Sequence, residues 1–559
     1  MDFKNLQFYG IDQLQDFLMR NSMNRKILIV SVIALIAIIT VGSASAGFFD
    51  FLTGDSERAP DELVCAAMPH GEEPEYGFDP MHGWGYNDGG VEPLIQSTLL
   101  KHGKDAKIVN DLATDYKASS DYKTYTVNIR DDVKFHDGSK LTAKDVAFSY
   151  NTAKETGENT DLSMMKSVKA VNDTQVKFEL DKSDSTFVHK LADLGIVPEA
   201  TYDNASYGQN PIGSGPYKFT QWDKGQQVIL ERNDDYYGKK PYYSKITNLF
   251  LDRDAAFSAV KSGDVDVAEV HYTYADEDVD GYHLERFKSV DMQGISLPLV
   301  PEGQETQEGN PAGNDVTADP AIREALNIGI DREKVIDTAL NGYGEPSTNG
   351  IGFLLPYTYD NFEDGKVDEA KKILDDAGWK DTDGDGIREK NGTKASWTLW
   401  YYPTLVYRES IAIAVSEQAK ELGLDMQLQG SNWDDIEGKY STMSIVWGGG
   451  GCDPSSVAYN YDSRLAGSGY SNPTLMNDSS VDALIDQARS QETNASYPTW
   501  SKMAQKANSH DPYIWIGSVD YTYFVNDNVD LSPDTATVYG HGGDIWGNVY
   551  DWKAANATA

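Results

Sequence analysis

The sequence predicts a mixed α/β fold. Short runs that alternate apolar and polar residues, as half-buried strands do, are interleaved along the chain with longer runs at helical spacing. Such an alternation of strands and helices is typical of mixed α/β sheets. The chain has 559 residues, of which 40% are hydrophobic. This length suits two or three domains, and the composition is sufficient for sizeable cores.

One segment, residues 125–150, shows the pattern most clearly. Residues 125–130 alternate their side chains with a period of two, which predicts a strand. The pair Asp137-Gly138 predicts a tight turn, because glycine tolerates positive φ and aspartate bonds its own backbone. Thr142 stands three residues before Asp145 and just ahead of apolar residues, which is a capping arrangement at a helix start. The spacing alone predicts no more than a strand, a turn and a helix.

The first half of the chain contains further elements of both kinds. Pro93 is tolerated in the first turn of a helix, and Gly263 is suited to closing one. We expect helices over 91–100, 142–154, 184–192 and 254–261, and strands over 63–68, 125–130, 175–180, 228–232 and 246–251.

The second half begins with a loop over 302–315, rich in Gly, Glu and Gln, which we expect to be exposed near the passage between domains. We expect helices over 319–328, 331–340, 367–377, 407–422, 480–489 and 496–508. Strands are expected over 396–401 and 442–447, followed by a final strand pair between residues 513 and 525.

Residues 23–46 carry the pattern of a secretory signal peptide. A basic start at residues 24–26 precedes an apolar run over 27–41 and the small-residue site Ala44-Ser45-Ala46. The run is short for a membrane span, which needs about 20 residues. We expect cleavage after Ala46, with Met23 as the true start and residues 1–22 as a mis-assigned extension. The alternative is an uncleaved N-terminal anchor.

The chain is strongly acidic. The full sequence has 48 Lys and Arg residues against 88 Asp and Glu residues, giving a formal net charge of -40. Such a surface repels nucleic acid and anionic lipid, so we expect no nucleic-acid partner. Of the two cysteines, Cys65 falls in the first predicted strand, where a buried thiol is expected. A disulfide between Cys65 and Cys452 cannot be deduced from the sequence.

Sequence motifs of enzymes are absent. The chain has no Gly-x-Ser-x-Gly elbow, no His-Glu-x-x-His and no phosphate-binding P-loop. The Gly-Ser-Gly-Pro run at 213–216 is expected to form a turn between a loop and a strand. We therefore predict no catalytic residues and no required cofactor.

Four stretches of the sequence follow one another in a characteristic order. They are the segment YTVNIRDDVKFHDGSKLTAKDVAFSY at 125–150, NPIGSGPYKF at 210–219 with LERNDDYYG at 230–238, IREAL at 322–326 with IDR at 330–332, and WGGGGCDP at 447–454. Together they resemble the family-5 extracellular solute-binding proteins, the receptors of ATP-driven importers for dipeptides, oligopeptides, opines and nickel. The resemblance covers roughly residues 63–550.

This resemblance implies a two-lobed periplasmic-binding-protein fold with mixed sheets and a hinge of two crossing strands. Lobe I with its subdomain would take residues 47–288, lobe II residues 289–518, and residues 519–559 would return to lobe I. Ligand would lie in the cleft between the lobes, which closes by hinge motion.

The resemblance also indicates which residues would line the ligand-binding cleft. In dipeptide-binding relatives, an Asp after the Trp-x-Gly of the 447 segment holds the peptide's amino terminus, whereas this chain has Gly450 there. The spacing from Trp447 to Asp453 also suits nickel-binding relatives, but residues 152–200 contain no Arg that could hold an anionic chelator. Aromatic residues where cleft walls are expected are Trp84, Tyr401, Tyr402, Trp433 and Trp447. Each of them could instead belong to a core.

Two histidines predict a transition-metal alternative. His82 and His541 lie in glycine-flanked loops that this fold would place at the lobe I side of the cleft. Two imidazoles suit Ni²⁺ or another late transition metal, and a chelator such as free histidine could complete the coordination. The simpler interpretation is two unrelated loop histidines.

A calcium site is the other metal hypothesis. Asp381, Asp383 and Asp385 stand at positions one, three and five of an EF-hand-like loop, with Ile387 at seven and Glu389 at nine. Position twelve is a glycine, so the bidentate glutamate of such a loop is missing. The simpler interpretation is an acidic hairpin-like turn without metal.

The sequence therefore predicts an extracellular receptor of an ABC importer that captures a peptide or a nickel chelate. Its partners would be an ABC permease and ATPase complex, and the receptor itself would be a monomer. An alternative is a sensor or chaperone that presents ligand to a membrane receptor, and a further one is an extracellular peptide hydrolase.

Overall fold

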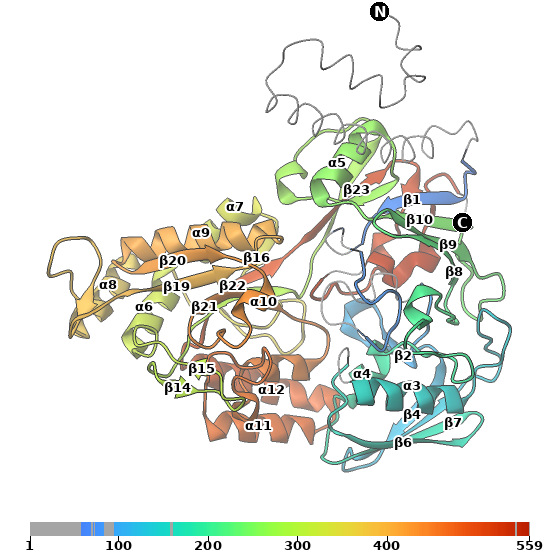
Figure 1. Cartoon of the computed structure of the whole chain (residues 1–559), viewed down its shortest axis with the longest axis horizontal. Helices are drawn as coiled ribbons and strands as arrows, with labels where there is room; N and C mark the ends of the chain where they lie inside the picture. The colour runs from blue at the N-terminus through green and yellow to red at the C-terminus, as the bar shows by residue number, and fades with distance from the viewer. Residues whose placement is uncertain are drawn as a thin grey trace, which may run out of the picture. The chain divides into compact units, whose positions relative to one another are not determined.

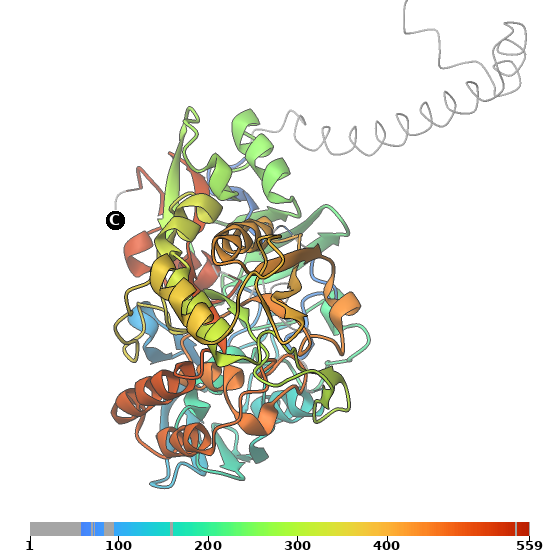
Figure 2. The ribbon, with the colours of Figure 1, turned by 90° about the vertical axis from the view of Figure 1, so that its left-hand side faces the viewer.

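The computed structural model describes residues 58–68, 71, 73–82, 94–156, 160–542 and 545–557 of the chain. The predicted signal peptide and Trp84 lie outside these residues. Residues Asp61–Ala559 form one compact unit, and the elements below all belong to it. Two large β-sheets organise this unit (Figures 1 and 2).

The first large sheet has seven strands in the order β12-β23-β11-β1-β10-β9-β8. Its strands are β1 (Glu62–Ala66), β8 (Tyr217–Asp223), β9 (Gln227–Arg232), β10 (Lys245–Leu249), β11 (Val267–Glu269), β12 (Tyr282–Phe287) and β23 (Tyr521–Asn526). The central strand β1 pairs in parallel with β10 and β11, and its last four residues are buried. A central parallel strand is covered on both faces, which explains its continuous apolar run. Helix α5 (Arg253–Ser262) ends at Gly263, whose φ of 78° is the left-handed conformation expected there.

A smaller antiparallel sheet has the order β4-β5-β7-β6, with β4 at Ala113–Ala118, β5 at Thr124–Ile129, β6 at Met165–Asn172 and β7 at Gln175–Leu180. The side chains of β5 alternate between buried and half-buried, as the period of two predicts. Helices α3 (Ala143–Thr156) and α4 (Phe187–Asp193) belong to the same part of the chain, which has its own apolar core. At the start of α3, the backbone N–H of Thr142 donates to Asp145 Oδ2 at 2.8 Å, so the predicted capping arrangement is confirmed.

The second large sheet has six strands in the order β16-β22-β13-β21-β19-β20. Its strands are β13 (Met292–Ser296), β16 (Gly344–Pro346), β19 (Ser396–Tyr401), β20 (Asp425–Gly430), β21 (Ser444–Gly449) and β22 (Tyr513–Val519). Its helices are α6 (Pro320–Gly329), α7 (Arg332–Leu340), α8 (Val367–Asp376), α9 (Val406–Glu421), α10 (Trp433–Ile436), α11 (Ser479–Arg489) and α12 (Thr493–Asn508). Several begin at an aspartate that accepts a backbone N–H of the first turn, as Asp319 does for α6 and Asp331 for α7.

Two segments connect the large sheets: the chain passes from β12 to β13 through residues 288–291, and from β22 to β23 through Asp520. Figure 1 shows β22 and β23 running in line from one sheet to the other. We call the seven-stranded and four-stranded sheets with their helices the first lobe, and the six-stranded sheet with its helices the second lobe. Asp291 and Asp520 in the connections are both fully buried.

Two expectations about local structure are corrected, and the state of the cysteines is resolved. The helix expected over 91–100 is absent in its described part: Leu94 and Ile95 accept backbone hydrogen bonds from Tyr217 and Gly215, so this segment pairs with extended chain instead. The loop over 302–315 holds a small hairpin, β14 (Gln304–Glu305) and β15 (Pro311–Ala312), whereas the passage between the lobes runs through 288–291. No disulfide joins Cys65 and Cys452, and both side chains are buried.

Candidate functional site

Three of the aromatic residues predicted as cleft walls come together in the second lobe. Trp433 opens α10, and its ring centroid lies 6.2 Å from that of Trp447 on β21, with the rings nearly perpendicular. Tyr402, just after β19, lies 6.2 Å from Trp433, and Tyr470 lies 5.1 Å from it. We call Tyr402, Trp433, Trp447 and Tyr470 the aromatic wall. All four rings are half-buried, so each retains surface that a solute could cover.

Tyr401 does not belong to this wall. Successive side chains of a strand point to opposite faces, so Tyr401 is directed away from its neighbours Trp400 and Tyr402. Its hydroxyl donates to Glu409 Oε1 at 3.0 Å on α9. This contact gives Tyr401 a packing role between β19 and α9.

A buried arginine, which the sequence did not suggest, backs the aromatic wall. Arg408 lies near the start of α9 and is 2% exposed. Its guanidinium carbon is 6.0 Å from the ring centroid of Trp433, and its Nε donates to Gln293 Oε1 at 3.3 Å. A guanidinium that has lost most of its water is a strong binder of carboxylates.

A chain of polar contacts leads from Arg408 to the predicted histidine near the C-terminus. Gln293 Nε2 donates to Asp291 Oδ1 at 2.9 Å, and the same carboxylate oxygen lies 2.7 Å from His541 Nδ1. Tyr521 donates to the other oxygen of Asp291 at 2.9 Å. In neutral His541 this carboxylate accepts the hydrogen bond of Nδ1 and so holds the proton on that nitrogen. His541 therefore stands next to the hinge connection at Asp291.

His82 has its described contacts in the first lobe. Its Nε2 lies 2.6 Å from Asn204 Oδ1, and its ring stacks on Tyr76 at 6.1 Å. The burial of Asp79, the largest effect, raises the pKa of this nearby carboxyl, and the charge of His82 opposes that rise. A shared metal between His82 and His541 stays a prediction.

The glycine run after Trp447 is required by close packing. Gly450 has φ +148°, and a Cβ built there would lie 2.1 Å from the carbonyl oxygen of Val290. No side chain fits this backbone path, which explains why no acid stands at the position where dipeptide-binding relatives have one. A Cβ on Gly448 would lie 2.4 Å from Gln293 Nε2 and 2.7 Å from Arg408 Nη2. Gly448 thus makes room for the two polar side chains of the site.

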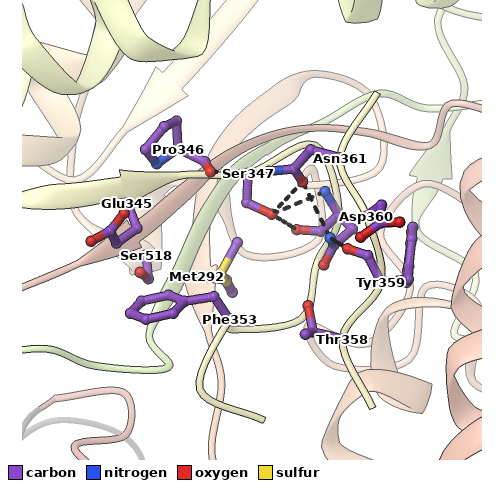
Figure 3. Close-up of a pocket in the computed structure, with 11 residues that line it drawn as sticks. Met292, Glu345, Pro346, Ser347, Phe353, Thr358, Tyr359, Asp360, Asn361 and Ser518 are labelled. Atoms are coloured by element: carbon purple, nitrogen blue, oxygen red, sulfur yellow. Dashed lines mark hydrogen bonds between the residues drawn. The ribbon is translucent and has the colours of Figure 1, made fainter. Parts of the chain in front are cut away.

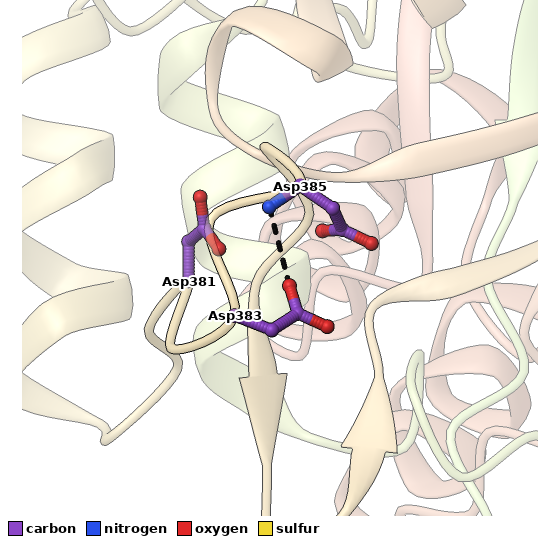
Figure 4. Close-up of side chains that lie close together, drawn as sticks. All are labelled: Asp381, Asp383 and Asp385. Atoms are coloured by element: carbon purple, nitrogen blue, oxygen red, sulfur yellow. Dashed lines mark hydrogen bonds between the residues drawn. The ribbon is translucent and has the colours of Figure 1, made fainter.

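The acidic loop proposed for calcium forms a cluster of exposed carboxylates (Figure 4). Asp381 accepts the backbone N–H groups of Gly384 at 2.7 Å and Gly386 at 3.0 Å. The ammonium of Lys394 lies 3.1 Å from Asp383 Oδ2 and also contacts Asp385. These hydrogen bonds raise the pKa of Lys394, so the loop receives a positive charge from its own chain.

Glu389 and the backbone N–H of Ile387 also take part in the hydrogen bonds of this loop. Glu389 on β17 (Glu389–Lys390) accepts the backbone N–H of Thr382 at 2.8 Å, and the N–H of Ile387 donates to Asp385 Oδ1 at 2.9 Å. These contacts stabilise the loop as an acidic turn. A calcium ion at the loop stays a prediction.

A pocket of about 200 Å³ lies beside the connecting strands (Figure 3). It is lined by Met292 of β13, Ser518 of β22, Glu345 of β16 and residues of the loop over 347–361. None of the aromatic-wall residues lines it. This pocket is therefore separate from the site formed by Arg408 and the aromatic wall. No helix among the described residues is both long and apolar enough to cross a membrane.

The sequence matches the family model of the bacterial extracellular solute-binding proteins, family 5, over residues 107–468. It is 33% identical to the oligopeptide-binding protein AppA of Bacillus subtilis over 367 residues, which are 62% of this chain and 65% of AppA. It is 26% identical to the nickel-binding periplasmic protein of Escherichia coli over 405 residues, which are 68% of this chain and 72% of that protein.

Solved structures give the same two-lobed architecture. AppA of Bacillus subtilis in complex with a nonapeptide superposes with a TM-score of 0.71 and 26% identity, covering 89% of this chain and 99% of AppA. NikZ of Campylobacter jejuni in complex with Ni(L-His) superposes with a TM-score of 0.74 and 23% identity, covering 89% and 100% of the two chains. The predicted two-lobed α/β fold is confirmed.

Proposed function

Because the chain belongs to family 5 of the bacterial extracellular solute-binding proteins, we propose that it is the receptor of an ABC importer, which captures a solute between its lobes and delivers it to a permease. The two connecting segments between the large sheets allow one lobe to rotate against the other. A solute that contacts both lobes then shifts the population toward the closed arrangement. This family consists of binding receptors, and no catalytic step enters the proposal.

The buried guanidinium of Arg408 beside the aromatic wall is the observation that supports a ligand class. It favours a solute with a carboxylate, which it can hold by paired charge-assisted hydrogen bonds. The half-buried faces of Trp433 and Trp447 favour an apolar or ring-bearing group next to that carboxylate. Peptides and amino-acid chelates of nickel both have these features.

His541 gives additional support to a nickel chelate as the ligand. Its Nδ1 is held by Asp291 at 2.7 Å, and histidines that bind metals commonly have such a carboxylate on their other nitrogen. The 33% identity to AppA, an oligopeptide-binding protein, supports a peptide as the ligand. His82 would complete the nickel site from the first lobe.

The experiment is a thermal-shift screen of the exported chain, residues 47–559, at constant calcium. Nickel with histidine is one arm and a mixed peptide pool is the other. A ligand at about 100 times its dissociation constant adds roughly 2.7 kcal/mol to the free energy of unfolding, which raises Tm by a measurable amount. The variants are His541→Ala and, as a matched control, the exposed His283→Ala on β12.

A shift with nickel and histidine that is lost in His541→Ala, but kept in His283→Ala, supports a nickel chelate. A shift with peptides that both variants keep supports a peptide receptor and removes the histidine from the site. No shift in either arm contradicts the proposed ligand class.

The proposed function also implies where the protein acts and which proteins it binds. The receptor acts as a monomer outside the cell membrane, at its outer face or in a periplasm, and its partners are an ABC permease and ATPase complex. Copurification of the exported chain with an ABC permease is the direct check on that partnership.

A further inference from the structure

The two lobes contact each other away from the connecting segments, through helix α4 of the first lobe. Lys190 of α4 places its Nζ 3.1 Å from Asp453 Oδ2 in the second lobe. Next to this pair, the hydroxyl of Tyr459 in the second lobe donates to the carboxylate of Asp161 in the first. The backbone N–H of Ser185, just before α4, donates to the carbonyl of Arg489 at 2.7 Å.

The Lys190–Asp453 pair is buried at this contact. The side chain of Lys190 is 13% exposed and that of Asp453 is 9% exposed. Burial, the largest single effect, acts to lower the pKa of Lys190, but the charge of Asp453, its hydrogen bond to Lys190 and the nearby Tyr459 and Asp193 together raise that pKa. Burial likewise acts to raise the pKa of Asp453, yet Lys190 and His189 hold it at about 2. Both groups are therefore charged at neutral pH and depend on each other.

The two partners are not equivalent. Asp453 also caps the short helix η6 (Pro454–Asn460), where it accepts the backbone N–H of Ser455 at 2.8 Å and its hydroxyl at 2.9 Å. These contacts lie within the second lobe, so they hold Asp453 in place whether or not the lobes touch. Lys190 belongs to the first lobe, so it contacts Asp453 only while the lobes touch. When the lobes separate, its ammonium group would be hydrated.

We propose that Lys190 and Asp453 form an interlobe latch, an ion pair that stabilises the closed arrangement of the lobes without any bound solute. The proposal rests on the lobe closure of the proposed function. A closed arrangement that lacks one partner would leave the other charge buried and unpaired, which is strongly unfavourable. An arrangement with separated lobes hydrates both charges, so loss of one partner shifts the population to the open form.

The test measures the distance between the lobes in the exported chain without ligand, by pulsed electron spin resonance between nitroxide labels. Labels are attached at Lys169→Cys on β6 and Lys502→Cys on α12, two exposed positions on different lobes. The buried thiols of Cys65 and Cys452 are replaced by serine in every sample. Because no solute is present, the result does not depend on which ligand the protein binds.

The variants are Lys190→Met, Asp453→Asn, their combination and the conservative Lys190→Arg. Asparagine retains the helix cap at 453, so Asp453→Asn tests the charge and not the cap. Lys177→Met is the control, because Lys177 pairs with Glu179 at 2.8 Å on the exposed face of a single sheet. Melting curves establish that each variant is folded.

We expect each single variant to lower the closed-to-open ratio by about tenfold, because each leaves a buried charge without its partner. The double variant should lower the closed-to-open ratio by less than the two single effects combined. Lys190→Arg and Lys177→Met should keep the interlobe distances of the parent. Single variants with the parent's distance distribution would overturn the latch. Strictly additive single effects would overturn it too, since they would show that the two side chains do not act on each other.

Discussion

Single residues of the candidate site depend on glycines that leave room for polar side chains. The missing Cβ of Gly448 allows Gln293 and Arg408 to approach β21, and Gln293 in turn contacts Asp291. Through Asp291 the contacts reach His541. One wall of the site is thus a connected polar network behind aromatic rings, and a change at one member is transmitted to the others.

Arg408 shows what the sequence could not reveal at this scale. Residues 407–422 predicted a helix correctly, and an arginine near the start of an amphipathic helix is usually solvent-exposed. Its burial follows from the glycine opposite it on β21, 40 residues later in the sequence. Trp433 and Trp447 were predictable as wall residues because the family resemblance located them, whereas nothing local distinguished Arg408.

A first prediction concerns the pH dependence of stability through His136. Its ring accepts the backbone N–H of Gly213 on Nδ1 at 3.3 Å and lies 3.1 Å from the carbonyl of Gly215 on Nε2. Burial lowers the pKa of His136 to about 4, well below 6.5. The folded protein therefore binds fewer protons than the unfolded chain between these pH values. The contribution of His136 to the free energy of unfolding is complete above pH 6.5 and is lost as pH falls toward 4.

The measurement is the free energy of unfolding by urea at pH 7.5 and pH 4.5. His136→Gln should reduce the loss of stability between these pH values by about 1–2 kcal/mol, since glutamine does not titrate. The exposed His283→Gln is the control and should keep the parent's dependence. An unchanged dependence in His136→Gln would contradict the assignment.

A second prediction concerns Gly450 and has a control in the next residue. Gly450→Ala forces a Cβ to within 2.1 Å of Val290 O at a φ of +148°, so we expect a loss of at least about 2 kcal/mol in the free energy of unfolding. Gly451→Ala meets nothing within 4 Å and should change stability by less than about 1 kcal/mol. Equal effects of the two substitutions in urea unfolding would refute this explanation of the glycine run.

At the scale of elements, the sequence predicted the positions of helices better than it predicted which strands pair. Helices α6, α7, α8 and α9 fall where the sequence predicted them, because helical periodicity is a local signal. The helix expected over 91–100 failed because Leu94 and Ile95 bond to residues 215 and 217, a partnership that no local pattern contains. Strands β12 and β13, which lead into and out of the first connection, were not predicted either, since β13 has a glycine in its centre.

A third prediction concerns the acidic loop between α8 and β17. If Asp381, Asp383 and Asp385 hold calcium, the ion must displace the ammonium of Lys394. Lys394→Met should then bind Ca²⁺ about tenfold more tightly than the parent chain, because one positive charge a few ångströms away is removed. Lys390→Met, which breaks a pair with Asp319 outside the loop, is the control.

Isothermal titration with calcium chloride decides this point. Tighter binding confined to Lys394→Met supports a calcium loop. Absence of calcium binding to all three proteins would establish the loop as an acidic turn held by its own lysine.

At the scale of the whole molecule, the two lobes could be predicted only through the family resemblance. Each large sheet is assembled from distant segments: β23 follows β1 by more than 400 residues, yet both belong to the seven-stranded sheet. Periodicity carries no information about such partners. The order of the four matched stretches supplied the architecture, and it could not supply the interlobe pair of Lys190 and Asp453.

The lobes, the site and the latch form one mechanical arrangement. His541 and Asp291 adjoin a connecting segment, while Asp453 follows Trp447 by six residues. Closure therefore brings α4 against the chain that continues from the aromatic wall. A bound solute and the latch would favour the same closed arrangement, and their free energies would add.

The most direct test of the account is a titration of the exported chain with the solute found by the thermal-shift screen, for the parent, Arg408→Gln and Arg130→Gln. Arg130 pairs with Asp132 at 2.6 Å on the surface of the first lobe and serves as the control. We predict one solute per chain, with at least about a tenfold loss of affinity in Arg408→Gln, since a charge-assisted contact contributes 1.5–3 kcal/mol, and no change in Arg130→Gln. Parent-like binding by a folded Arg408→Gln would contradict the account, because the carboxylate of the solute would then not be held by Arg408.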